Sequence, residues 1–112
     1  MGSIARRNPP GLKLIVKSPV WDDLREIGQR VAADNPEAAG RFLSAAENAF
    51  ELIRRHPGIG RLRSFSLPGV RSWVVPEFGN YVIFYLPTKE DVQILAVLHG
   101  ARDLSRVLNE RE

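Results

Sequence analysis

Hydrophobic and polar residues alternate near the start of the chain. Leu12, Leu14 and Val16 occupy every second position, so their side chains fall on one face of an extended segment. This period of two predicts a half-buried strand over residues 12–17.

The spacing of apolar residues then changes to three or four, which is typical of amphipathic helices. A first stripe consists of Val20, Leu24, Ile27 and Val31. A second stripe consists of Ala39, Phe42, Leu43, Ala46, Ala49, Phe50 and Ile53. Because only a short polar segment separates the two stripes, the sequence predicts a tight antiparallel hairpin of two helices.

Each predicted helix has a start signal, and the second also has an end signal. Ser18-Pro19 and Asn35-Pro36 each place a capping side chain before a proline that suits the first helical position. Asp22 and Asp23 are expected in the first turn of the first helix, where the helix dipole favours negative charge. Pro57 disfavours helical geometry in the residue before it, so the second helix should end there.

The second half of the chain contains segments rich in β-branched and aromatic residues. They cover residues 70–75, 81–86 and 92–99, and short turn segments separate them. This pattern predicts an antiparallel meander, preceded by a loop over residues 58–69. Asp103 is positioned to cap a short C-terminal helix.

The predicted order is therefore β-α-α-β-β-β-α, which is an α+β fold. Both helical stripes need a cover, and the simplest packing places the hairpin on one face of a small antiparallel sheet, as two layers. Residues 12–112 are expected to form one domain, because a chain of 112 residues is too short for two ordinary domains. Residues 1–11 are expected to form a flexible N-terminal extension.

The composition argues against several classes of chemistry. The absence of cysteine rules out disulfides and thiolate ligands, and two histidines leave little for a metal site, so we expect no metal and no cofactor. The longest apolar stretches are strand-sized, far below the roughly 20 residues of a membrane-spanning helix. Arg6 and Arg7 are not followed by the apolar run of a secretory signal. We therefore expect a cytoplasmic protein with no membrane partner.

The net charge of +3 conceals an uneven distribution. No carboxylate occurs between Leu52 and Pro76. The arginines of this window are Arg54, Arg55, Arg61, Arg63 and Arg71. The planar guanidinium group suits phosphate or carboxylate, so composition alone is compatible with nucleic acid, an acidic protein segment or solvent.

Short motifs along the chain resemble those of one toxin superfamily. They are residues 35–42 (NPEAAGRF), 56–61 (HPGIGR), 70–71 (VR), 80–85 (NYVIFY) and 94–103 (ILAVLHGARD). Each motif is weak alone, but their order is similar to that of the ParE/RelE superfamily from about residue 12 to about residue 108. The resemblance implies the β-α-α-β-β-β-α fold and a toxin of a type II toxin-antitoxin pair.

Three residues favour the ParE branch of that superfamily. ParE-type members are associated with poisoning DNA gyrase, whereas RelE-type members are ribosome-dependent endoribonucleases. Trp73, Val75 and Glu77 stand where the RelE type carries two lysines and an arginine, and none of them can stabilise a charged phosphorane. The resemblance therefore implies a gyrase inhibitor that is not itself an enzyme and that a cognate ParD-like antitoxin neutralises.

Two other functions compatible with the resemblance stay open. One is a metal-independent endoribonuclease acting on ribosome-bound messenger RNA. Its candidate catalytic residues are Arg71, Tyr85, His99 and Arg102. A histidine suits proton transfer near neutral pH, although one that precedes a glycine at a strand end more often holds a turn. The other function is that of a relative that keeps only antitoxin binding.

The candidate binding residues are arginines in two places. Candidate target-binding residues are Arg61, Arg63, Arg71 and Arg102. They are grouped because the loop before residues 70–75 and the turn after residues 92–99 can meet at one end of the sheet. Arg102 could equally pair with Asp103 or Glu77. Candidate antitoxin-binding residues are Arg30 and Arg41, on polar helix faces. DNA is expected to be contacted only through the antitoxin or the gyrase complex.

Overall fold

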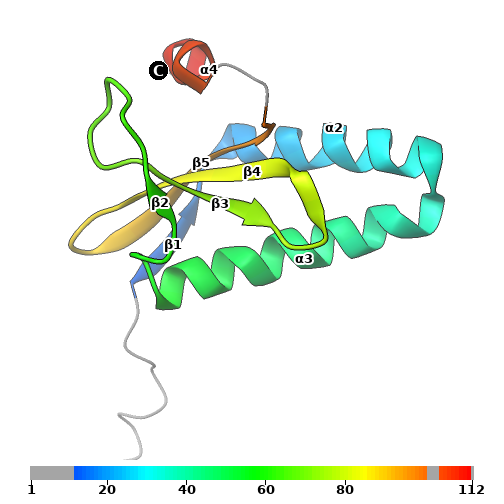
Figure 1. The fold of residues 1–112 in the computed structure, drawn as a ribbon, viewed down its shortest axis with the longest axis horizontal. Coiled ribbons are helices and arrows are strands. Elements are labelled where there is room, and N and C mark those ends of the chain that lie inside the picture. Colours follow the sequence, from blue (N-terminus) through cyan, green and yellow to red (C-terminus); the bar gives the residue numbers. More distant parts are fainter. Residues whose placement is uncertain (1–11, 101–103, 112) are drawn as a thin grey trace, which may run out of the picture.

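A computed structural model describes residues 12–100 and 104–111 of the chain. Its elements are β1 (Lys13–Val16), α2 (Ser18–Asp34), α3 (Pro36–Arg55), β2 (Arg61–Leu62), β3 (Arg71–Val75), β4 (Phe78–Pro87), β5 (Asp91–His99) and α4 (Leu104–Arg111). Figure 1 shows α2 and α3 as a hairpin beside the sheet. The α+β fold and the order of the main elements agree with the prediction, and β2 is an addition within the expected loop. The expected extension of residues 1–11 and the capping role of Asp103 lie outside the described residues.

The strands form one mixed sheet in the order β1-β5-β4-β3-β2. Antiparallel pairing of β3 with β4 and of β4 with β5 confirms the predicted meander. In contrast, β1 lies parallel to β5, with Leu14 opposite Val92 and Val16 opposite Ile94. The expectation of a wholly antiparallel sheet is therefore wrong for β1, because alternation along a strand does not reveal the direction of its partner.

The helix start signals are confirmed for one helix and wrong for the other. The Asn35 side chain caps α3 by accepting a hydrogen bond at 3.1 Å from the backbone N–H two residues on. α2 already begins at Ser18, its N-cap position is Lys17, and no described side chain caps it, so the expected Ser18 cap is wrong. Asp22 and Asp23 lie beyond the first turn of α2, which corrects their expected role at the helix dipole.

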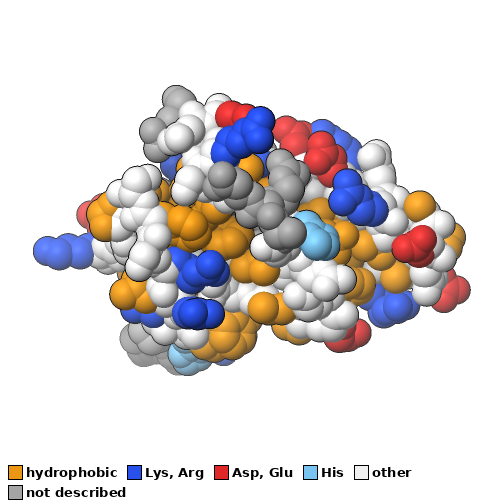
Figure 2. All heavy atoms as spheres, turned by 45° about the horizontal axis from the view of Figure 1, so that its top comes forward, with side chains coloured by type: hydrophobic (Ala, Val, Ile, Leu, Met, Phe, Trp, Pro, Cys, Tyr) orange, Lys and Arg blue, Asp and Glu red, His pale blue; other side chains and the backbone are white. Residues whose placement is uncertain are grey.

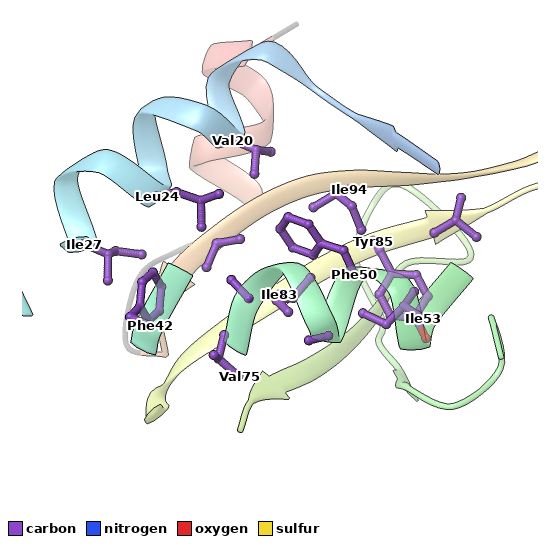
Figure 3. Close-up of a cluster of buried hydrophobic side chains, with 14 residues drawn as sticks. Val20, Leu24, Ile27, Phe42, Phe50, Ile53, Val75, Ile83, Tyr85 and Ile94 are labelled. Carbon is purple, nitrogen blue, oxygen red and sulfur yellow. The ribbon is translucent and has the colours of Figure 1, made fainter. Parts of the chain in front are cut away.

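Two apolar clusters cover opposite faces of the sheet. The larger, shown in Figure 3, lies between the hairpin and the sheet and contains Val20, Leu24, Ile27, Phe42, Ala46, Ala49, Phe50, Ile53, Val75, Ile83, Tyr85, Val92, Ile94 and Val97. The smaller contains Val70, Phe84, Leu95, Ala96, Leu98, Leu104 and Val107. Because Ile83 and Phe84 are neighbours on one strand, their side chains point to opposite faces. α4 thus covers the face away from the hairpin and adds a partial third layer to the two predicted.

Candidate functional site

Three of the four arginines assigned to target binding lie on or beside the short pairing of β2 (Arg61–Leu62) with β3. Arg61 lies on β2, Arg63 follows it, and Arg71 begins β3. β2 pairs with β3 so that Arg61 is opposite Ser72, and Arg63 N donates to Val70 O at 2.8 Å. Arg102 lies outside the described residues.

Two of these guanidinium groups are engaged within the protein. Arg71 Nη1 donates to the carbonyl oxygens of Gly60 at 2.7 Å and Gly58 at 3.3 Å. Arg63 Nη1 donates to Ser72 Oγ at 3.1 Å, and its guanidinium carbon lies 5.5 Å from the centre of one phenylalanine ring and 5.8 Å from another. Arg61 is exposed, and no hydrogen bond or ion pair of its side chain is found within residues 12–100 and 104–111. Because Arg61 pairs with Ser72, strand alternation places the Arg71 side chain on the other face of the sheet from those of Arg61 and Arg63. The three arginines are close along the backbone but differ in face and in availability.

Tyr85 fixes the loop that carries these arginines. Its side chain is fully buried, its hydroxyl donates to Pro57 O at 2.7 Å, and it accepts from Gly60 N at 2.8 Å. A Cβ atom on Gly60 would lie 2.5 Å from that hydroxyl, so only glycine fits. Burial raises the pKa of Tyr85 above its ordinary value of 10.0, while the Gly60 N–H and the charge of Arg71 act in the opposite direction. The hydroxyl is thus a neutral structural link, not an exposed proton donor.

Loss of that hydroxyl is expected to loosen the loop. In Tyr85→Phe, Gly60 N–H and Pro57 O lose their partner, which should lower the free energy of unfolding by about 1–3 kcal/mol. The raised pKa adds a pH dependence. Above about pH 10 the unfolded chain loses the phenolic proton first, so the folded state binds more protons and stability falls as pH rises. Urea unfolding from about pH 8 to about pH 11 should show a shallower alkaline decline in Tyr85→Phe than in a Tyr81→Phe control.

His99 lies at the other end of the sheet from the arginines. β4 pairs Tyr85 with Arg71 but Tyr81 with His99, and those two tyrosines are about 13 Å apart along the strand. The His99 ring packs edge-on against Tyr81, with ring centres 5.6 Å apart. The chain leaves β5 on that side, because Gly100 N donates to Asn80 O at 2.7 Å. The start of β3 and the end of β5 therefore lie at opposite ends of the sheet. The expectation that they lie at the same end is wrong for the described residues.

The three residues that favoured the ParE branch on sequence provide no positive charge for a binding or catalytic site. They are Trp73, Val75 and Glu77. Val75 is fully buried, and Trp73 packs against the same core. The Trp73 indole N–H is buried and has no hydrogen-bond partner among the described residues. Glu77 is exposed in the turn between β3 and β4, with a φ of 71°. Val75 and Trp73 therefore contribute to core packing, and Glu77 occupies a turn.

The two arginines assigned to the antitoxin flank the helical hairpin. Arg30, on α2, is exposed beside a cavity of about 240 Å³ that also borders Tyr81 and His99. Arg41, on α3, is exposed beside Glu37 and Glu77. Their positions on polar helix faces agree with the prediction, and they lie on different sides of the hairpin.

Sequence reasoning missed a buried ion pair between α2 and α4. Asp23 is 8% exposed, and its carboxylate accepts from Arg111 Nη1 at 3.0 Å and from Val97 N at 3.0 Å. Arg111 Nη1 also donates to Leu95 O at 2.9 Å. Beyond the last residue of β1, these contacts provide hydrogen-bond partners for the backbone N–H of Val97 and the carbonyl of Leu95 on the edge of β5. The sequence did contain a signal that Asp23 is buried, because Asp23 lies three residues after Val20 and therefore on the buried face of the helix.

Two kinds of site are absent from the part of the chain that the structure describes. No group of three or more His, Asp or Glu side chains there is placed to hold a metal ion. No helix among those residues has the length and apolar character needed to cross a bilayer. The described surface instead offers hydrogen-bonding cations and exposed apolar side chains, which are features of protein contacts.

Comparison with known proteins decides the family. A family model described as the ParE toxin of the type II toxin-antitoxin system parDE matches residues 14–104. The chain belongs to the ParE toxin family. ParE toxins are the toxin component of a type II system, and the match includes both helices of the hairpin and every strand apart from the first residue of β1.

Individual relatives agree with this membership of the ParE family. Toxin ParE3 of Caulobacter vibrioides is 30% identical over 100 residues, which cover 88% of this chain and 97% of the relative. The putative toxin Y4kP of Sinorhizobium fredii is 31% identical over 85 residues, which cover 76% and 84%. A solved structure of the chromosomal ParDE system from P. aeruginosa matches with a TM-score of 0.67 at 18% identity, covering 79% of this chain and 95% of that one. That structural match extends the agreement to the fold.

Proposed function

We propose that this ParE-type toxin inhibits DNA gyrase as a binding protein, without catalysing a reaction, and that a cognate ParD-like antitoxin holds it inactive. The observation that carries the proposal is the ParE family match over residues 14–104. The gyrase target and the antitoxin are what that membership suggests. The side chains of the described surface add support, because they fit a binding role better than a catalytic one.

Within residues 12–100 and 104–111, the candidate catalytic residues of the endoribonuclease alternative do not converge on one point. Metal-free RNA cleavage requires a proton acceptor, a proton donor and cations that stabilise the phosphorane. Tyr85 has its hydroxyl engaged in two hydrogen bonds within the core. His99 lies about 13 Å along the sheet from the row that holds Arg71. A phosphate could not contact both at once.

Gyrase inhibition requires that the toxin hold one state of the enzyme. Gyrase that has cleaved DNA presents phosphates and acidic protein groups, both of which accept charge-assisted hydrogen bonds from guanidinium groups. The exposed Arg61, next to the partly buried Arg63 and Arg71, is the described cation best placed for such a bond. Inhibition should therefore weaken as salt increases.

Purified components test the target assignment directly. The protein should inhibit supercoiling by purified gyrase, and cleaved DNA should accumulate in the same reactions. A heat-unfolded sample of the same protein serves as the matched control. If the folded protein leaves both supercoiling and cleaved DNA unchanged over a wide range of ratios to gyrase, the gyrase assignment fails.

The helical hairpin offers a surface for the antitoxin. Trp21 is 50% exposed and Leu43 is 42% exposed, and both border a groove of about 530 Å³ between α2 and α3. Gly28 and Gly40 lie in the same groove, and a Cβ atom on either would meet nothing within 4 Å. A groove of this shape can receive the apolar face of an amphipathic helix from a partner that orders on binding.

Charge reversal on the hairpin should weaken antitoxin binding. The double variant Arg30→Glu, Arg41→Glu is expected to lower the affinity for the antitoxin roughly tenfold at low salt, because rim charges contribute modestly and are screened. The matched control is Lys13→Glu, Lys89→Glu, which makes the same charge change at exposed positions that do not belong to the hairpin helices. Titration calorimetry at two salt concentrations measures both. Equal affinities for the two double variants would contradict the electrostatic part of the proposal.

A further inference from the structure

A second apolar groove lies at the edge of the sheet, away from the helical hairpin. Exposed apolar side chains lie there: Val74 is 47% exposed and Ile59 is 37% exposed. The groove measures about 610 Å³, and its lining includes Val74 and Ile59 together with the charged residues Arg61, Arg63 and Glu77. Figure 2 shows basic side chains beside exposed apolar ones over the end of the molecule that carries β2. We call this surface the β3 edge groove.

The β3 edge groove exists because β2 is too short to cover β3. β2 pairs only with Arg71 and Ser72, so from Trp73 to Val75 the outer edge of β3 has no strand beside it, while the inner edge pairs with β4. The chain before β2 forms a tight turn instead of extending the strand, since Ile59 N donates to His56 O at 2.9 Å. Pro76 follows directly and has no N–H to donate. The open edge is therefore too short for a long added strand, and recognition must rest on side chains.

The charges of the groove favour an acidic protein over nucleic acid. Arg63 is engaged with Ser72, which leaves Arg61 as the exposed guanidinium of the groove, and the exposed carboxylate of Glu77 in the same lining would repel phosphate. Phosphate-backbone binding draws on many cations at once, commonly about 6 to 10 contacts. One exposed arginine beside aliphatic side chains instead resembles the centre of a protein–protein contact. A carboxylate next to an apolar side chain would complement both halves of the groove.

We propose that the β3 edge groove is the surface through which the toxin docks on the gyrase protein, at a gyrase segment that presents an acidic side chain beside an apolar one. This inference rests on the proposed function and names the part of the toxin that performs it. In the docked state Arg61 pairs with the carboxylate, and Val74 and Ile59 enclose the apolar side chain. The hairpin groove is a separate surface, so target docking and antitoxin binding are separable by substitution.

Binding of purified gyrase holoenzyme to immobilised toxin tests the inference. Arg61→Glu and Val74→Glu change exposed positions, and unchanged melting temperatures would establish that each variant is folded. Each is expected to weaken gyrase binding by about tenfold or more, with a parallel loss of inhibition. Leu43→Glu, which places the same charge in the hairpin groove, is the matched control and should bind gyrase as the original protein does.

Salt dependence separates a protein contact from a phosphate contact. Between about 50 and about 200 mM salt, binding through one exposed arginine should weaken by less than about tenfold, whereas four phosphate contacts would weaken it on the order of 100-fold. A steep slope that requires DNA would overturn the inference in favour of phosphate binding.

The remaining outcomes distinguish this inference from the proposed function. If the original protein binds and inhibits gyrase but Arg61→Glu and Val74→Glu do so equally well, the groove assignment is wrong and the target stands. If Leu43→Glu alone loses binding, the hairpin is the docking surface. If the original protein neither binds nor inhibits gyrase, the target assignment fails and this inference fails with it.

Discussion

Replacing Asp23 with alanine is expected to lower the free energy of unfolding by about 3–5 kcal/mol, because it removes one partner of a buried ion pair. Arg111 would keep its charge at a largely buried position, and Val97 N–H would lose its acceptor. For a domain of this size the loss corresponds to a fall in melting temperature of roughly 15 °C or more. Chemical and thermal unfolding of the purified variant measure both quantities.

The neighbouring carboxylate provides a matched control for this prediction. Asp22 also forms an ion pair with an arginine, Arg25, but the two side chains are 65% and 63% exposed. Exposed pairs contribute little, so Asp22→Ala should change stability by less than about 1 kcal/mol. Similar losses for Asp22→Ala and Asp23→Ala would show that burial of the Asp23 pair does not stabilise the fold as argued.

The second large effect is an absence of RNA cleavage. The protein should not cleave RNA, free or on translating ribosomes, with or without divalent metal. Removing one well-placed charge stabiliser typically lowers a catalytic rate roughly 100- to 1000-fold, and Trp73, Val75 and Glu77 stand where the RelE type carries three such groups. Sequencing of RNA ends after incubation with ribosomes is the measurement.

A His99→Ala variant sharpens that experiment. Cuts at defined codons that appear with the original protein and disappear with His99→Ala would identify His99 as a catalytic residue. Such a result would promote the endoribonuclease alternative over gyrase inhibition. Weak cleavage that persists unchanged in His99→Ala would instead indicate a contaminating nuclease.

Local signals predicted most of the secondary structure. The errors occur at residues whose conformation or pairing depends on partners that are distant in sequence. Asn35-Pro36 starts α3 as expected because a cap needs only neighbouring residues. Ser18 did not act as a cap, and Asp23 points into the core because Arg111, far away in sequence, supplies its partner. β1 pairs in parallel with β5, which no pattern within residues 12–17 could specify.

The candidate site was predicted in part for the same reason. Arg61, Arg63 and Arg71 lie on or beside one short pairing of β2 with β3, so their nearness along the backbone follows from local chain geometry, although the Arg71 side chain points to the other face. Which of them remains available depends on contacts that form only in the folded chain, namely those of Arg71 with the Gly60 carbonyl and of Arg63 with the Phe65 and Phe84 rings. The separation of His99 from the arginines depends on strand register, which composition does not reveal.

The central claim is that the protein stops growth through gyrase, and one measurement in living cells tests it most directly. The gene is induced alone, and incorporation of labelled nucleotides and amino acids is recorded from the moment of induction. The proposed function predicts that DNA synthesis stops first while protein synthesis continues. An immediate arrest of protein synthesis with DNA synthesis still running would contradict it.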